Sequence, residues 1–175
     1  MEIAPKLRAA RLPQADPGAL FLVRDDTGSY VALAVKGPHE GDRLVLVLGP
    51  PSPEVPEVPV LTNFSLDTVV VSFGREYTLR LPCDVKAWLP AEPRVGQCVV
   101  LSGDKVYVRG RYYRQFNQAI HVYVGIEDGL LVVNRSGEFA HPSDRSDDCA
   151  YSVDCAFLTV EKDPRVILSL SGASG

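Results

Sequence analysis

Side-chain alternation in residues 105–124, KVYVRGRYYRQFNQAIHVYV, constrains the fold more than any other stretch of the sequence. Two alternating runs lie on either side of a short polar connection, which is typical of an antiparallel β-hairpin. Valines at even positions fall on one face, and polar and aromatic residues fall on the other. Asn117 is the connecting residue best suited to a positive φ. We therefore expect two long paired strands.

The alternation also limits how these two strands pair. A slip of one residue would bring the valines of one strand onto the polar face of its partner, so two registers remain. The first places His121 opposite Arg109, and the second places it opposite Arg111. Both gather the same side chains on one face, and these are the candidate ligand-binding residues: Tyr107, Arg109, Arg111, His121 and Tyr123.

A further strand is expected before the hairpin. Residues 97–102, QCVVLS, precede Gly103-Asp104, which suits a type II′ turn. A two-residue turn would pair Val99 with Val108 and place Cys98 opposite Arg109. This register predicts one core-facing set: Val99, Leu101, Val106, Val108, Ile120 and Val122. Asp128-Gly129 is a type I′ turn signal, so we expect a central four-stranded meander over about residues 97–134.

The remaining sequence predicts an all-β fold. Short apolar runs bounded by Gly, Pro and Asp recur, and helical periodicity is nearly absent. Residues 29–36, SYVALAVK, are apolar on both faces, which is typical of a central strand buried on both sides. We predict one domain over residues 1–175, an antiparallel partly open barrel or sandwich, with a short irregular N-terminal segment and a disordered C-terminal tail.

Three connecting segments carry more local predictions. Residues 6–12 have a weak helical pattern. Residues 50–59 contain five prolines and are expected to form a rigid surface crossover. Gly74-Arg75 fits a tight hairpin turn between strands at 66–73 and 76–81.

Composition narrows the classes of function. The 175 residues carry a net charge of -4, which argues against general nucleic-acid binding. No secretory signal and no membrane-spanning apolar run is present, so a cytoplasmic location is expected. The sequence leaves open whether the four cysteines are free thiols: Cys83, Cys98, Cys149 and Cys155.

Sequence motifs supply no catalytic, metal or cofactor site. The serine hydrolase elbow, the dinucleotide-binding glycine motif and the Walker phosphate loop are all absent. Cys149 and Cys155 do not have zinc-site spacing, and the acidic residues 144–154 do not match a calcium loop. We therefore assign no catalytic residue, no metal and no cofactor.

The hypothesis that follows is a non-enzymatic β-domain that binds a partner protein or a small anionic ligand. Arginine pairs bidentately with carboxylate or phosphate, which favours the Arg109 and Arg111 face. One alternative is an enzyme that uses His121 as general acid or base on an anionic substrate. Another is a single-stranded nucleic-acid-binding barrel, suggested by the alternation of Arg and Tyr. Open strand edges also allow a homo-oligomer.

Overall fold

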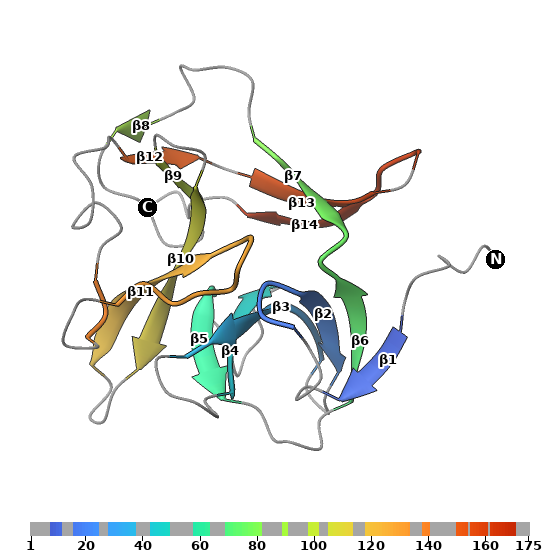
Figure 1. Ribbon diagram of the computed structural model, residues 1–175, viewed down its shortest axis with the longest axis horizontal. Coiled ribbons are helices and arrows are strands. Elements are labelled where there is room, and N and C mark those ends of the chain that lie inside the picture. Colours follow the sequence, from blue (N-terminus) through green and yellow to red (C-terminus); the bar gives the residue numbers. More distant parts are fainter. Residues whose placement is uncertain are drawn as a thin grey trace.

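The computed structural model describes residues 8–11, 16–24, 28–37, 43–49, 58–63, 69–81, 89–90, 98–101, 105–113, 118–133, 138–140, 150–153, 155–160 and 162–170. Within these residues every regular element is a strand, as the sequence predicts (Figure 1). For β1, β8, β9 and β12 the description covers the backbone alone. Asn117, Trp88, the tail at 171–175 and Cys83, Cys98 and Cys149 as side chains all lie outside the described part.

A large sheet contains most of the strands. Its order is β1-β6-β2-β3-β4-β5-β10-β9-β12-β8, and β11 pairs with β10. Its strands are β1 (Arg8–Arg11), β2 (Leu20–Arg24), β3 (Ser29–Lys36), β4 (Arg43–Gly49), β5 (Val60–Asn63), β6 (Val69–Gly74), β8 (Leu89–Pro90), β9 (Cys98–Leu101), β10 (Val106–Tyr113), β11 (Ala119–Gly125) and β12 (Ala150–Val153).

A second sheet has three strands and lies above β2, β3 and β6 of the large sheet in Figure 1. Its order is β14-β13-β7. Its strands are β7 (Tyr77–Arg80), β13 (Cys155–Thr159) and β14 (Val166–Leu170). The two sheets share a core, because Phe157 and Leu170 of the small sheet pack with Leu33, Val108 and Val124 of the large one.

Apolar alternation explains most of these strands. β3 is buried from Tyr30 to Val35, as expected for a strand that is apolar on both faces. Val31, Leu33 and Val35 join the shared core, and Tyr30, Ala32 and Ala34 join a separate cluster with β2, β4, β5 and β6. The large sheet rolls until Leu130 reaches Lys36 through one parallel bridge, which gives a partly open barrel.

β10 has one edge shared between two partners. β11 pairs with the other edge along residues 107–113. On the shared edge, Val106 to Val108 pair antiparallel with β9, and Arg111 and Tyr112 pair parallel with β5. β10 therefore joins the N-terminal strands to the C-terminal half, a parallel contact that the sequence analysis did not include.

The meander continues past β11 through single bridges. Leu131 bridges Val124, and the N–H of Val132 donates to the carbonyl of Tyr123 at 2.9 Å. Val133 then bridges Phe139 in the same antiparallel sense. In place of the fourth strand of the expected meander, the structure has single bridges in residues 131–133 and 138–140. We call these residues the return segment.

The predicted register of β9 is wrong by one residue. The backbone pairs Val99 with Tyr107 and Cys98 with Val108, so Cys98 does not lie opposite Arg109. Val99 and Leu101 consequently do not pair with the valines of β10. β9 is also paired along its other edge with β12, and this register leaves the connection one residue longer than a two-residue turn.

Two other local predictions are wrong. Residues 8–11 form β1, paired antiparallel with β6, so the weak helical pattern over 6–12 does not correspond to a helix at these residues. Gly74-Arg75 is not a hairpin turn, because β6 pairs with β1 and β2 while β7 pairs with β13. Gly74, with a φ of 69°, instead lies where the chain passes from the large sheet to the small one. Of the proline-rich crossover, residues 50–57 lie outside the described part.

Candidate functional site

The β10–β11 register brings two arginines and a histidine to one face of the hairpin. Arg111 lies opposite His121, and Arg109 lies opposite Tyr123. This is the second of the two registers that the sequence allowed. Directly opposed residues lie about 5 Å apart between Cβ atoms, and diagonal neighbours about 7–8 Å. Arg109, Arg111 and His121 therefore form one group, which we call the cationic patch.

The two tyrosines of the predicted site have a different environment. Tyr123 is only 4% exposed and packs against Val132, with Tyr107 and Ala140 completing the cluster. The return segment covers this end of the face, with the N–H of Ala140 donating to the carbonyl of Val132 at 3.1 Å. Tyr123 is thus a core residue of a small satellite cluster, and the accessible part of the predicted site is the cationic patch.

Electrostatics distinguish the members of the cationic patch. His121 is exposed. Its pKa is lowered below the usual value by partial burial first, then by the charges of Arg109 and Arg111. The Nε of Arg109 is buried and has no hydrogen-bond partner among the residues described. An oxygen acceptor against this guanidinium would offset part of the cost of a buried unpaired donor.

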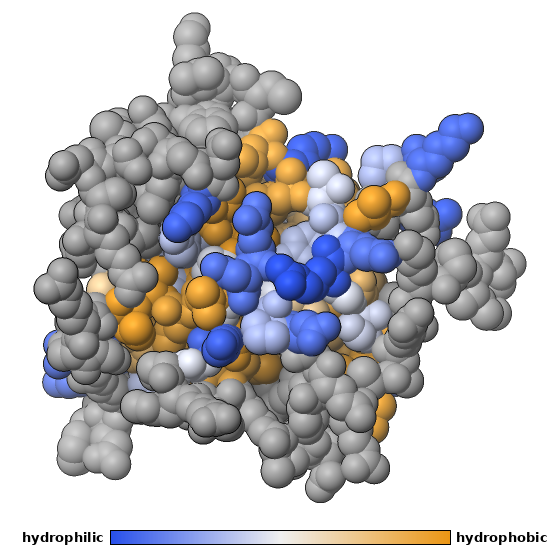
Figure 2. Space-filling view, in the orientation of Figure 1, coloured by the Kyte–Doolittle hydropathy of each residue, from blue (hydrophilic) through white to orange (hydrophobic). Residues whose placement is uncertain are grey.

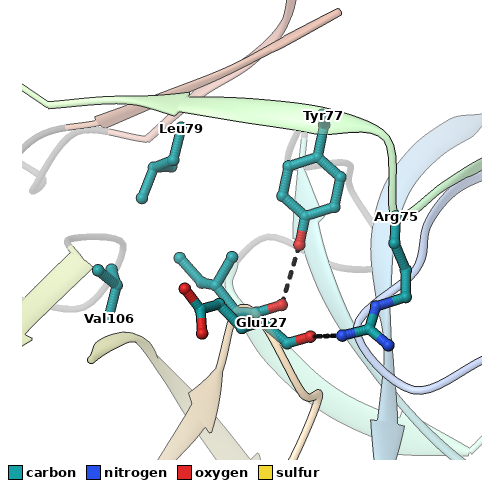
Figure 3. A pocket seen from close by; sticks show the side chains of 6 residues that line it. Arg75, Tyr77, Leu79, Val106 and Glu127 are labelled. Carbon is teal, nitrogen blue, oxygen red and sulfur yellow. Dashed lines mark hydrogen bonds between the residues drawn. The ribbon is translucent and has the colours of Figure 1, made fainter. Parts of the chain in front are cut away.

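A pocket of about 390 Å³ lies between the two sheets. We call it the junction pocket; Figure 3 shows its lining. The pocket is lined by Arg75, Tyr77, Leu79, Val106, Ile126 and Glu127. On the whole face of the molecule drawn in Figure 2, hydrophilic residues gather in the middle, with hydrophobic groups above them and to one side.

Tyr77 fixes the wall of the junction pocket. Its hydroxyl lies 3.1 Å from the carbonyl oxygen of Gly18 and 2.9 Å from that of Ile126, within donating distance of both. Its ring packs on Phe157 with centroids 5.5 Å apart. The Arg75 guanidinium donates to the carbonyl of Glu127, on the other side of the same turn. The small sheet is thereby attached to the turn after β11 by two side chains.

Sequence reasoning missed the junction pocket because its walls come from strands far apart in the chain. Arg75, Tyr77 and Leu79 share one face of the β7 segment by alternation. That signal is visible in the sequence. Their partners, Val106 and the 126–127 turn, become neighbours only through the topology, and the expected hairpin turn at Gly74-Arg75 placed Arg75 elsewhere.

Across the described ranges, no group of three or more His, Cys, Asp or Glu residues is arranged to hold a metal ion. Cys155 is a buried free thiol. In the part of the chain that is described, no helix has the length and hydropathy needed to cross a membrane.

Comparison with known proteins assigns no family. No family model, no curated protein and no solved structure matches this chain. The site must therefore be interpreted from its own geometry.

Proposed function

We propose that this protein is a non-enzymatic β-domain that binds an anionic group through the cationic patch. The observation that carries the proposal is the register itself, which sets Arg111 opposite His121 with Arg109 one pair further along. Guanidinium groups bind carboxylate and phosphate through paired hydrogen bonds. The anionic group can belong to a small ligand or to an acidic side chain of a partner protein, because the recognition chemistry is shared.

The surroundings of His121 favour binding over catalysis. Among the described residues, the charged groups that shift its pKa are both arginines, and no carboxylate is among them. A general base needs a group that orients it and stabilises its protonated form, as a carboxylate does. Partial burial, and then the two arginines, instead favour the neutral imidazole by lowering its pKa, which suits a hydrogen-bonding contact to a ligand.

The two tyrosines of the predicted site, Tyr107 and Tyr123, are not placed to stack with bases, which favours an anion over a nucleic-acid strand. Base stacking needs an exposed aromatic face. Tyr123 is buried and Tyr107 packs against it in the satellite cluster. A cytoplasmic location belongs to the same proposal, and it is consistent with the free thiol of Cys155.

Sulfate is a suitable probe, because it resembles phosphate and keeps its charge over the relevant pH range. We expect sulfate to shift the amide resonances of Arg111 and His121 with an affinity in the millimolar range. Arg111→Gln should lower that affinity roughly fivefold, the scale of one exposed charge pair. The matched control is Arg24→Gln, which removes one exposed positive charge from the end of β2.

The pH dependence gives a second readout. Because the pKa of His121 is lowered below its usual value, the ring is neutral near pH 7 and gains its charge only as the pH falls below the usual histidine range. Sulfate should therefore bind more tightly as the pH falls through this range, and His121→Gln should remove most of that rise. If Arg24→Gln weakens sulfate as much as Arg111→Gln does, or if no resonance of β10 or β11 moves, the proposal is wrong.

A further inference from the structure

The junction pocket combines one carboxylate with an apolar lining. Glu127 is exposed, and its side chain has no ion pair or hydrogen bond among the residues described. In Figure 3 its carboxylate lies on the side of Val106, below Leu79. The Arg75 guanidinium lies on the other side of the turn, where it bonds to the Glu127 carbonyl instead of the carboxylate. The negative charge is therefore left available next to the apolar side chains.

Other groups around the pocket also suit a positively charged ligand group. The carbonyl oxygen of Ile126 and the Tyr77 hydroxyl lie beside the turn, and the ring of Tyr77 forms one wall. An aromatic ring attracts a cation through its quadrupole, and oxygen acceptors solvate an ammonium group. The side chains of Leu79, Val106 and Ile126 suit the apolar body of the same molecule.

We propose that the junction pocket binds a small amphipathic amine, with its ammonium group on the Glu127 carboxylate and its apolar body against Leu79, Val106 and Ile126. This site is separate from the cationic patch. Val106 and Tyr107 alternate to opposite faces of β10, so the two sites lie on different sides of that strand. A volume of about 390 Å³ is large enough for a molecule with a single aromatic ring.

The probes are phenethylamine and 3-phenylpropionate, which share a ring and a short alkyl chain but carry opposite charges. We expect phenethylamine to shift the amide resonances of Val106 and Glu127, and 3-phenylpropionate to leave them unchanged. Glu127→Gln keeps the shape of the side chain and removes its charge, so it should lower the amine affinity roughly fivefold. Asp163→Asn is the matched control, because it removes one exposed negative charge in the β13–β14 connection.

A variant of Arg75 tests whether the pocket binds a positively charged group. Arg75→Gln removes a like charge near the amine while keeping a donor for the Glu127 carbonyl, so amine binding should stay equal or become tighter. The proposal is overturned if Arg75→Gln abolishes binding of phenethylamine, since Arg75 would then be needed to hold the amine and would not act as a like charge beside it. It is equally overturned if 3-phenylpropionate binds as well as the amine, if Glu127→Gln behaves like Asp163→Asn, or if phenethylamine shifts no pocket resonance. Near-identical circular dichroism spectra of the variants would exclude loss of folding as the cause.

Discussion

Val108 and His121 lie on neighbouring strands of one hairpin in opposite environments. Val108 is fully buried in the shared core, and His121 is exposed on the cationic patch. Alternation alone predicts this difference, because the two positions differ in parity along paired strands. A substitution should therefore lower the free energy of unfolding more at Val108 than at His121.

We expect Val108→Asp to lower the free energy of unfolding by about 3 kcal/mol or more, because it buries an unpaired charge. His121→Ala should cost no more than about 1 kcal/mol. Urea denaturation midpoints of the two variants provide the comparison. A larger loss for the histidine variant would mean that the two faces of the hairpin are assigned the wrong way round.

Residue-level prediction succeeded where alternation was strict and failed where a third element intervened. Val108 and Val122 are fully buried as expected, whereas Val106 and Ile120 are only half-buried because they lie nearer the ends of the paired region. Tyr123 has the predicted face but is covered by the return segment. No property of the hairpin sequence itself shows that residues 132–133 and 138–140 lie over it.

At the scale of elements, β10 depends on a close approach to β5. The N–H of Arg111 donates to the carbonyl of Pro59 at 2.9 Å, next to Gly110. A Cβ atom added at Gly110 would lie 2.6 Å from Leu46 Cδ1 and 3.2 Å from the Pro59 oxygen. Leu46 is fully buried and has little room to move, so glycine is needed for this parallel contact.

Gly110→Ala should therefore destabilise the protein by about 1–3 kcal/mol, the usual cost of overpacking a core. Gly28→Ala is the control, since its added Cβ would lie 3.6 Å from the nearest atom, in ordinary contact. Urea midpoints and hydrogen exchange at the Arg111 amide measure the effect. Equal stability of the two variants would show that β5 and β10 are not packed as described.

The strands themselves were more predictable than their partners. The bounds of β3 match the expected run at 29–36, because it begins and ends at a clear change between apolar and polar residues. The register of β9 was missed because β12, from much later in the chain, pairs with its other edge. A turn preference is a weak constraint when a third strand is present.

At the scale of the whole molecule, two side chains of the segment that begins the small sheet attach it to the large sheet. The Tyr77 hydroxyl lies within donating distance of the carbonyl oxygens of Gly18, before β2, and Ile126, after β11. Its ring packs on Phe157 of β13. The Arg75 contact adds a second attachment at the same corner. Nothing in the local sequence around β7 shows that it leaves β6 for β13, so this architecture could not be predicted.

Tyr77→Phe tests this attachment, because it keeps the ring and removes the hydroxyl. We expect a loss of about 1 kcal/mol in the free energy of unfolding, the net value of one hydrogen bond. Exchange of the Ile126 and Gly129 amides should accelerate. Tyr112→Phe is the matched control, because it keeps the ring that packs on Phe139 and should change neither quantity. An effect confined to the Tyr112 variant would contradict the proposed role of Tyr77.

The pairing of β7 with β13 also has a consequence during synthesis of the chain. Tyr77 pairs with Thr159, and β7 has no other strand partner in the described sheets. As the ribosome releases the chain from its N-terminal end, β2, β3 and β4 can assemble early, whereas β7 must wait until residues 155–159 have emerged. Contacts between distant segments slow folding, because the intervening loop has to close first. The small sheet and the junction pocket should therefore form later than the part of the large sheet made by β2, β3 and β4.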